Sequence, residues 1–225
     1  MKKYELTAEF IEKWGKKLFR IKALISFGSV EAGELGGYVE KEDNLAQDGD
    51  AWVYGDAWVY GDARVYGDAW VCDNARVCGD ARVYGDAWVY GDAWVCDNAR
   101  VYGDAWVYGD ARVCGNAWVC DNARVCGDAR VYGDAEVCGN ADYLLIGRIG
   151  SRFSFTTFFK NKDKGITVSC GCFLGTIAEF RAKVTDTHGN NKHAKMYNLA
   201  ADMAELQILG EEHFDKLNTN KSEPF

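Results

Sequence analysis

Two cysteines and two histidines near the end of the chain are the residues whose types and spacing favour chemistry. Cys170 and Cys172 form a Cys-x-Cys pair, and His188 and His193 follow them. Thiolates and imidazoles are typical ligands of structural zinc, so the four residues are candidate zinc ligands. The Cys-x-Cys arm is tighter than usual, however, and residues 170 and 172 of one strand would share a face, as a buried pair also requires.

A nucleophile and base pair is the second chemistry to consider. Cys172 with His188 would need a third group to orient the histidine, and the sequence supplies none. The glycine-rich segment from Cys170 to Thr176, just before a predicted helix, is also compatible with an anion at the helix N-terminus. No one of these patterns is specific, and the sequence therefore predicts no catalytic residue, no bound metal and no cofactor.

The middle of the chain is an internal repeat with a period of six residues. From Asp50 to Asn140 one unit reads Ala-(Trp/Arg)-Val-(Tyr/Cys)-(Gly/Asp)-(Asp/Asn), with Glu136 once in place of Trp or Arg. In an extended chain Ala and Val point to one side and the residue between them points to the other. The Gly-Asp and Asp-Asn pairs are turn residues. Each unit is therefore predicted to be a short strand and a turn, and stacked units would bury Ala and Val along one axis.

This repeat resembles the hexapeptide-repeat left-handed β-helix proteins, in which three units form a triangular coil of 18 residues. The resemblance implies a mainly β fold, a left-handed parallel β-helix of about five coils. Through Gly36–Glu40, the repeats, Ile149–Phe159 and Cys170–Thr176, nearly the whole chain resembles hexapeptide-repeat proteins of bacteria and their phages or prophages. The repeat part is also similar to trimeric acyltransferases, but it lacks the histidine that those enzymes usually carry on or beside the β-helix.

An 18-residue coil would arrange the outward residues on three faces. One face carries Trp52, Trp70, Trp88 and Trp106, a second carries Arg64, Arg82 and Arg100, and a third alternates Trp58 and Trp94 with arginines. Four stacked indoles would expose more contiguous aromatic surface than a soluble monomer usually does, which predicts an interface. The alternative is a Trp ladder that, with interleaved Arg, only stabilises the coil.

The flanking segments differ in composition from the repeat. Residues 1–44 are predicted to be an N-terminal cap with a helix from Glu9 to Phe19 and a strand from Arg20 to Phe27, because an open β-helix end exposes core and unpaired backbone. Residues 45–147 form the β-helix, and residues 148–225 form an independent small α+β module.

The module is predicted to contain two strands and two helices. The strands run over 152–159 and 166–170, and a capping box at Thr176 and Glu179 opens a helix to Val184. The second helix, from about Lys192 to Leu209, has an apolar stripe on one face: Met196, Leu199, Met203 and Leu206.

The charge pattern and the cysteine count suggest a compartment and a kind of partner. The repeat holds fourteen Asp, one Glu and seven Arg, which accounts for the whole formal charge of −8. An acidic rod disfavours direct binding of nucleic acid. With no run of 18 apolar residues and no secretory leader, the sequence predicts no membrane partner and a cytoplasmic location in a bacterial host. Nine cysteines, an odd number, fit a reducing compartment with free thiols.

These features together predict a non-enzymatic, rigid rod. Its Trp and Arg faces would serve self-assembly as a dimer or trimer, or binding of a partner such as a host protein. A phage-encoded inhibitor that imitates nucleic acid through its acidic rod is one alternative, and an acyltransferase of the hexapeptide family is the other.

Overall fold

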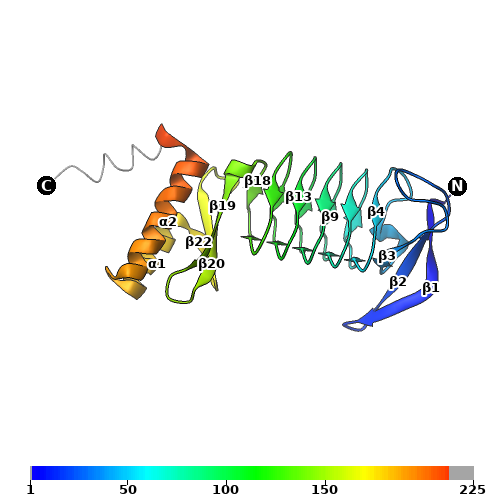
Figure 1. The fold of residues 1–225 in the computed structure, drawn as a ribbon, viewed down its shortest axis with the longest axis horizontal. Helices are drawn as coiled ribbons and strands as arrows, with labels where there is room; N and C mark the ends of the chain where they lie inside the picture. The colour runs from blue at the N-terminus through cyan, green and yellow to red at the C-terminus, as the bar shows by residue number, and fades with distance from the viewer. Residues whose placement is uncertain (1, 213–225) are drawn as a thin grey trace.

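The computed structural model describes residues 2–212 as an elongated molecule (Figure 1). A parallel β-solenoid forms its middle, an antiparallel sheet with a protruding hairpin lies at the N-terminal end, and an α+β module lies at the C-terminal end. The solenoid has about six turns, where the sequence predicts about five coils. Within the described residues, no helix has the length and apolarity needed to cross a membrane.

Three parallel sheets run along the solenoid. The first contains β4 (Trp52–Val53), β7 (Trp70–Val71), β10 (Trp88–Val89), β13 (Trp106–Val107) and β16 (Arg124–Val125). The second contains β6 (Arg64–Val65), β9 (Arg82–Val83), β12 (Arg100–Val101), β15 (Trp118–Val119) and β18 (Glu136–Val137). The third contains β5 (Trp58–Val59), β8 (Arg76–Val77), β11 (Trp94–Val95), β14 (Arg112–Val113) and β17 (Arg130–Val131).

The register of these sheets confirms the 18-residue coil and its three faces. Trp70 pairs with Trp88, Arg64 with Arg82, and Trp58 with Arg76, each pair 18 residues apart. Every repeat Ala from Ala51 to Ala135 and every repeat Val from Val53 to Val137 is fully buried. Since a buried valine contributes about 1.5–3 kcal/mol, this continuous Ala/Val core is the main source of the stability of the rod.

The turns between strands depend on residues that accept positive φ. Gly85 has φ 72°, and most other units have glycine at the same place. Three units have Asp there, and Asp97 has φ 58°. Its carboxylate accepts a hydrogen bond of 3.1 Å from the amide of Gly115, one coil further on. That hydrogen bond offsets part of the cost of a left-handed conformation at a residue that has a Cβ.

The N-terminal cap is all β, and the helix predicted from Glu9 to Phe19 is wrong. β1 (Tyr4–Lys13) and β2 (Lys16–Ala23) form a hairpin whose turn residues, Trp14 and Gly15, have φ 51° and 74°. β3 (Leu35–Val39) pairs with β2 on one side and with β5 on the other. The cap thus extends the third sheet, and this tertiary pairing overrides the local helical spacing. The strand predicted over Arg20 to Phe27 ends at Ala23.

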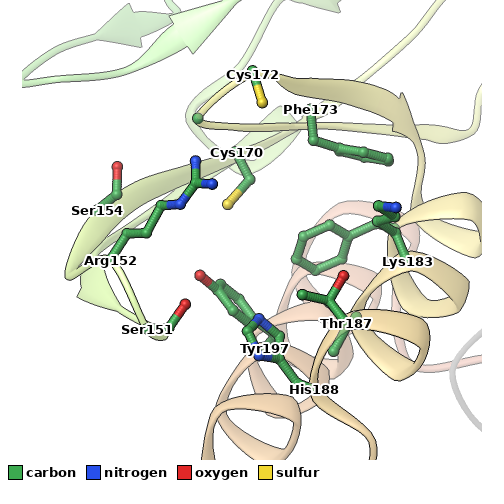
Figure 2. A pocket seen from close by; sticks show the side chains of 13 residues that line it. Ser151, Arg152, Ser154, Cys170, Cys172, Phe173, Lys183, Thr187, His188 and Tyr197 are labelled. Atoms are coloured by element: carbon green, nitrogen blue, oxygen red, sulfur yellow. The ribbon is translucent and has the colours of Figure 1, made fainter.

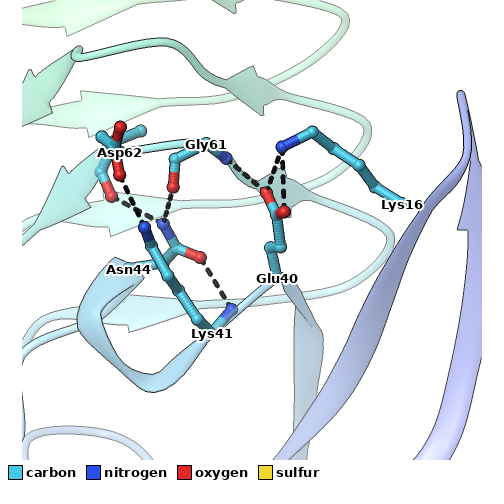
Figure 3. A network of polar contacts seen from close by, with 7 residues as sticks. Lys16, Glu40, Lys41, Asn44, Gly61 and Asp62 are labelled. Atoms are coloured by element: carbon cyan, nitrogen blue, oxygen red, sulfur yellow. Dashed lines mark hydrogen bonds and ion pairs between the residues drawn. The ribbon is translucent and has the colours of Figure 1, made fainter.

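A polar network ties the cap to the first turn of the solenoid (Figure 3). The buried Asn44, at the end of a 3-10 turn (Glu42–Asn44), donates from Nδ2 to the carbonyls of Gly61 (3.1 Å) and Ala63 (2.8 Å). Glu40 accepts hydrogen bonds from Lys16 Nζ (2.8 Å) and from the Gly61 amide (2.7 Å). The hairpin is therefore held against the rod by side chains as well as by the sheet.

The C-terminal module is a four-stranded antiparallel sheet with two helices packed on it. After a 3-10 turn (Asn140–Asp142), its elements are β19 (Tyr143–Ile149), β20 (Ser154–Lys160), β21 (Ile166–Cys170), β22 (Phe173–Thr176), α1 (Ile177–His188) and α2 (Lys192–Leu209). The structure confirms the capping box, since the Glu179 amide donates to Thr176 Oγ1 over 3.2 Å. It also confirms the second helix, whereas α1 continues one turn beyond the predicted end at Val184.

The module also closes the C-terminal end of the solenoid. Phe159 is fully buried in the solenoid core, and the Arg130 amide donates to Thr157 Oγ1 over 3.0 Å. The Tyr143 hydroxyl donates to the carbonyl of Arg124 over 2.6 Å. The boundary predicted between residues 147 and 148 falls inside β19, and the module shares core with the rod.

The apolar stripe of α2 faces away from the module. Met196, Leu199, Met203 and Leu206 are exposed, whereas the opposite side of the helix buries Tyr197 and small alanines. The alanines let α2 approach α1 and the sheet closely, and Arg181 of α1 binds Asp202 and Glu205 of α2, both at 2.7 Å.

Candidate functional site

The first sheet presents a ladder of three indoles. The ring centroids of Trp70 and Trp88 are 5.8 Å apart, and those of Trp88 and Trp106 are 6.0 Å apart, with the ring planes near parallel. The guanidinium of Arg124 lies 4.6 Å from the centroid of Trp106 and covers the end of the ladder. Trp88 is 40% exposed, although it stacks on both neighbours. Stacking thus stabilises the coil and still leaves aromatic surface at the middle of the ladder.

Trp52 does not belong to this surface, contrary to the sequence prediction. It is fully buried, with Tyr4 and Phe27 packed edge-on against its ring at centroid distances of 6.2 and 5.3 Å. The first coil lies beneath the N-terminal cap, so its outward residue becomes core. The hexad pattern treats all coils alike and does not distinguish this one.

On the other two faces, arginines cover the indoles. Arg76 lies 4.8 Å from the centroid of Trp58, and Arg112 lies 5.4 Å from that of Trp94. These are cation–π distances, as the ladder interpretation predicts. Arg64, Arg82 and Arg100 lie in register on the second sheet and form the predicted basic stripe.

Tyrosine ladders at the corners were not foreseen from the sequence. Tyr66, Tyr84 and Tyr102 stack with centroid distances of 4.8 and 5.0 Å, and Tyr90 stacks on Tyr108 at 4.9 Å. Burial raises the pKa of Tyr66 and Tyr102, and the neighbouring Tyr84 adds to the effect in both. The signal was present in the sequence, because tyrosine recurs at one hexad position every 18 residues.

Four of the repeat cysteines form disulfides, which corrects the prediction of free thiols. Cys96 is joined to Cys114 and Cys120 to Cys138, each pair on adjacent coils. In-register stacking places their Cα atoms 4.7 and 4.3 Å apart, so that the sulfur atoms meet. Asp97 and Asp121 lie beside these pairs. Metal binding there would require thiolates, which the disulfides do not provide.

The four candidate zinc ligands are not assembled into a metal site. Cys170 ends β21 and Cys172 is exposed in the turn before β22, so the two are not alternating residues of one strand. Gly171 between them has φ 61°. Cys170, Cys172 and His188 line one cavity, but His193 does not. Between residues 2 and 212, no cluster of three or more metal-ligating side chains includes them.

The cavity around Cys170 is the best-formed hollow of the C-terminal module (Figure 2). Its volume is about 210 Å³. Thr156 Oγ1 donates to Cys170 Sγ over 3.2 Å. Burial and the Cys170 thiol raise the pKa of Tyr197, and Arg152 opposes the shift, which places these three groups together. The sequence offered no signal for this grouping, because the residues come from separate elements.

Comparison with known proteins supports the architecture. Five segments of the chain match the family model described as YdcK beta solenoid repeat: residues 57–73, 75–91, 93–109, 105–121 and 123–139. All five lie in the solenoid and together cover less than half of the chain. No curated protein matches the chain. The fold and the repeat model together define a β-solenoid repeat protein with a cap at each end.

Proposed function

We propose that the protein is a non-enzymatic structural module, a rigid rod that assembles with a second copy through the ladder of Trp70, Trp88 and Trp106. The observation that carries this proposal is the 40% exposure of Trp88 in the middle of a stacked, in-register aromatic surface. An exposed aromatic surface of this kind is typical of interfaces. The uninterrupted Ala/Val core suits a spacer that holds the two end modules at a fixed separation.

Charge favours a parallel arrangement of the two copies. Asp68, Asp86 and Asp104 lie immediately before the strands of the first sheet, and Tyr90 and Tyr108 lie immediately after two of them. A two-fold axis parallel to the rods places the Asp column of one copy against the Tyr column of the other. An antiparallel pair would instead place Asp columns against each other, and like charges repel.

Light scattering after gel filtration tests this assembly. The native chain is expected to show a mass above 25.0 kDa, and Trp70→Ser with Trp88→Ser is expected to lower it towards that value. Trp58→Ser with Trp94→Ser is the matched control, since it removes two indoles from another face and should leave the mass unchanged. Circular dichroism verifies that each variant remains folded.

Two outcomes contradict the proposal. A native chain that is monomeric at all concentrations would leave the Trp ladder with a stabilising role only. A loss of the oligomer in Met203→Lys but not in the Trp variants would move the interface to the exposed stripe of α2.

Other parts of the proposal come from the resemblance. They are the left-handed sense of the solenoid, the bacterial or phage origin, and a host protein as a partner in place of a second copy. The acidic charge of the solenoid supports a basic partner if the partner is a host protein.

A further inference from the structure

The cavity of the C-terminal module has basic groups on several sides. Arg152 comes from the turn between β19 and β20, while Lys183 and His188 come from α1. No Asp or Glu is among the residues that line it. The nearest described carboxylate partner of these groups is Asp186, whose Oδ2 lies 3.5 Å from Lys183 Nζ in an exposed pair. Within residues 2–212, the guanidinium of Arg152 forms no ion pair, so it remains available to a ligand.

Hydroxyl groups accompany the basic side chains. Ser151, Ser154 and Thr187 line the same cavity, and the Tyr197 hydroxyl belongs to its wall (Figure 2). Hydroxyls and a guanidinium are donors that bind carboxylate or phosphate oxygens, and Arg does so with two parallel hydrogen bonds. The polar wall is therefore complementary to an anionic group.

The remainder of the cavity is apolar. Phe173, Phe180 and Val184 form this part, and the rings of Phe173 and Phe180 are 5.7 Å apart at their centroids. A volume of about 210 Å³ exceeds that of an engineered cavity of about 150 Å³ that holds benzene. One six-membered ring with a single substituent is thus of suitable size.

We infer that this cavity binds a small aromatic anion, with its ring against Phe173 and Phe180 and its carboxylate or phosphate among Arg152, Lys183 and His188. The apolar wall supplies burial of the ring, and the basic rim selects the charged group. This site is separate from the Trp ladder and does not depend on assembly of the rod.

Titration calorimetry on the full chain with benzoate and with phenyl phosphate tests the inference. Both probes are expected to bind, and benzamide, which has the shape of benzoate without its charge, is expected to bind at least tenfold more weakly. Inorganic phosphate is expected to bind more weakly than phenyl phosphate, because it lacks the ring. Preference for one probe over the other identifies the anionic group.

Variants of the exposed basic residues provide the control. Arg152→Gln with Lys183→Gln is expected to weaken benzoate binding at least tenfold, and both side chains are exposed, so the fold should be retained. Lys162→Gln with Lys195→Gln removes the same charge outside the cavity and should leave binding unchanged. Absence of benzoate and phenyl phosphate binding to the native chain, or equal binding by both double variants, would overturn the inference.

Discussion

Lys3 is a lysine with almost no solvent exposure, and it closes the open end of the solenoid. Its Nζ donates hydrogen bonds to the carbonyls of Asp48, Gly49 and Ala51 over 3.2, 3.1 and 2.9 Å. The ammonium also lies 4.9 Å from the ring centroid of Phe27. Carbonyls that no further coil can pair are thus satisfied by one side chain.

Replacing this residue tests its role. Lys3→Met is expected to lower the free energy of unfolding by about 1–3 kcal/mol, because buried carbonyls lose their donor. Lys2→Met is the control, since Lys2 is exposed and pairs only with Glu42. Urea denaturation of the three proteins measures the difference. Equal stability of the Lys3→Met variant and the native chain would show that the carbonyls do not need the ammonium.

The same variant has a pH dependence with a definite sign. Burial lowers the pKa of Lys3 to about 8, against the attraction of Asp48, Asp50 and Asp68. Between that pH and the usual pKa of 10.5 the unfolded chain binds more protons than the folded one, so this group adds stability as the pH rises. The loss caused by Lys3→Met is therefore expected to be larger at pH 9 than at pH 7.

At the scale of the elements, the turns limit how closely the coils stack. Gly85 and Gly133 both have φ near +70°, yet a Cβ on Gly85 would lie 3.0 Å from the Gly103 amide, whereas a Cβ on Gly133 would meet nothing within 4 Å. Gly133→Ala is expected to cost roughly 1–2 kcal/mol for the left-handed backbone alone. Gly85→Ala should cost more, and thermal unfolding measures the difference. Equal losses would mean that stacking does not constrain the turn.

The elements also show what the sequence could predict. The 18-residue register follows from the hexad because each coil repeats the same Ala, Val and turn positions. The hairpin of β1 and β2 could not be predicted locally, since its hydrogen bonds come from pairing with β3, which itself continues a sheet of the rod. The helix α2 was predictable in its bounds, but not the outward direction of Met203 and its neighbours, because alanines take the core side.

At the scale of the whole molecule, the candidate sites depend on contacts between distant segments. Phe27 and Tyr4 remove Trp52 from the surface, which left the predicted four-indole face with three exposed or half-buried members. The cavity near Cys170 brings Arg152 beside Lys183 of a helix more than two elements later. Sequence spacing carries no information about such meetings, whereas it specified the Arg stripe of the rod fully.

The location of the charge leads to a test of how the rod associates. The repeat carries the whole formal charge of −8, so two rods side by side repel each other over distances that salt can screen. The Debye length falls from about 10 Å at 0.1 M salt to about 3 Å at 1 M. Self-association through the Trp ladder is therefore expected to strengthen with salt, with a dissociation constant that falls several-fold in sedimentation experiments. Asp86→Asn with Asp104→Asn should flatten this dependence, because both residues flank the ladder. Association that weakens with salt would contradict an aromatic contact between like-charged rods and would favour a basic partner bound to the acidic turns.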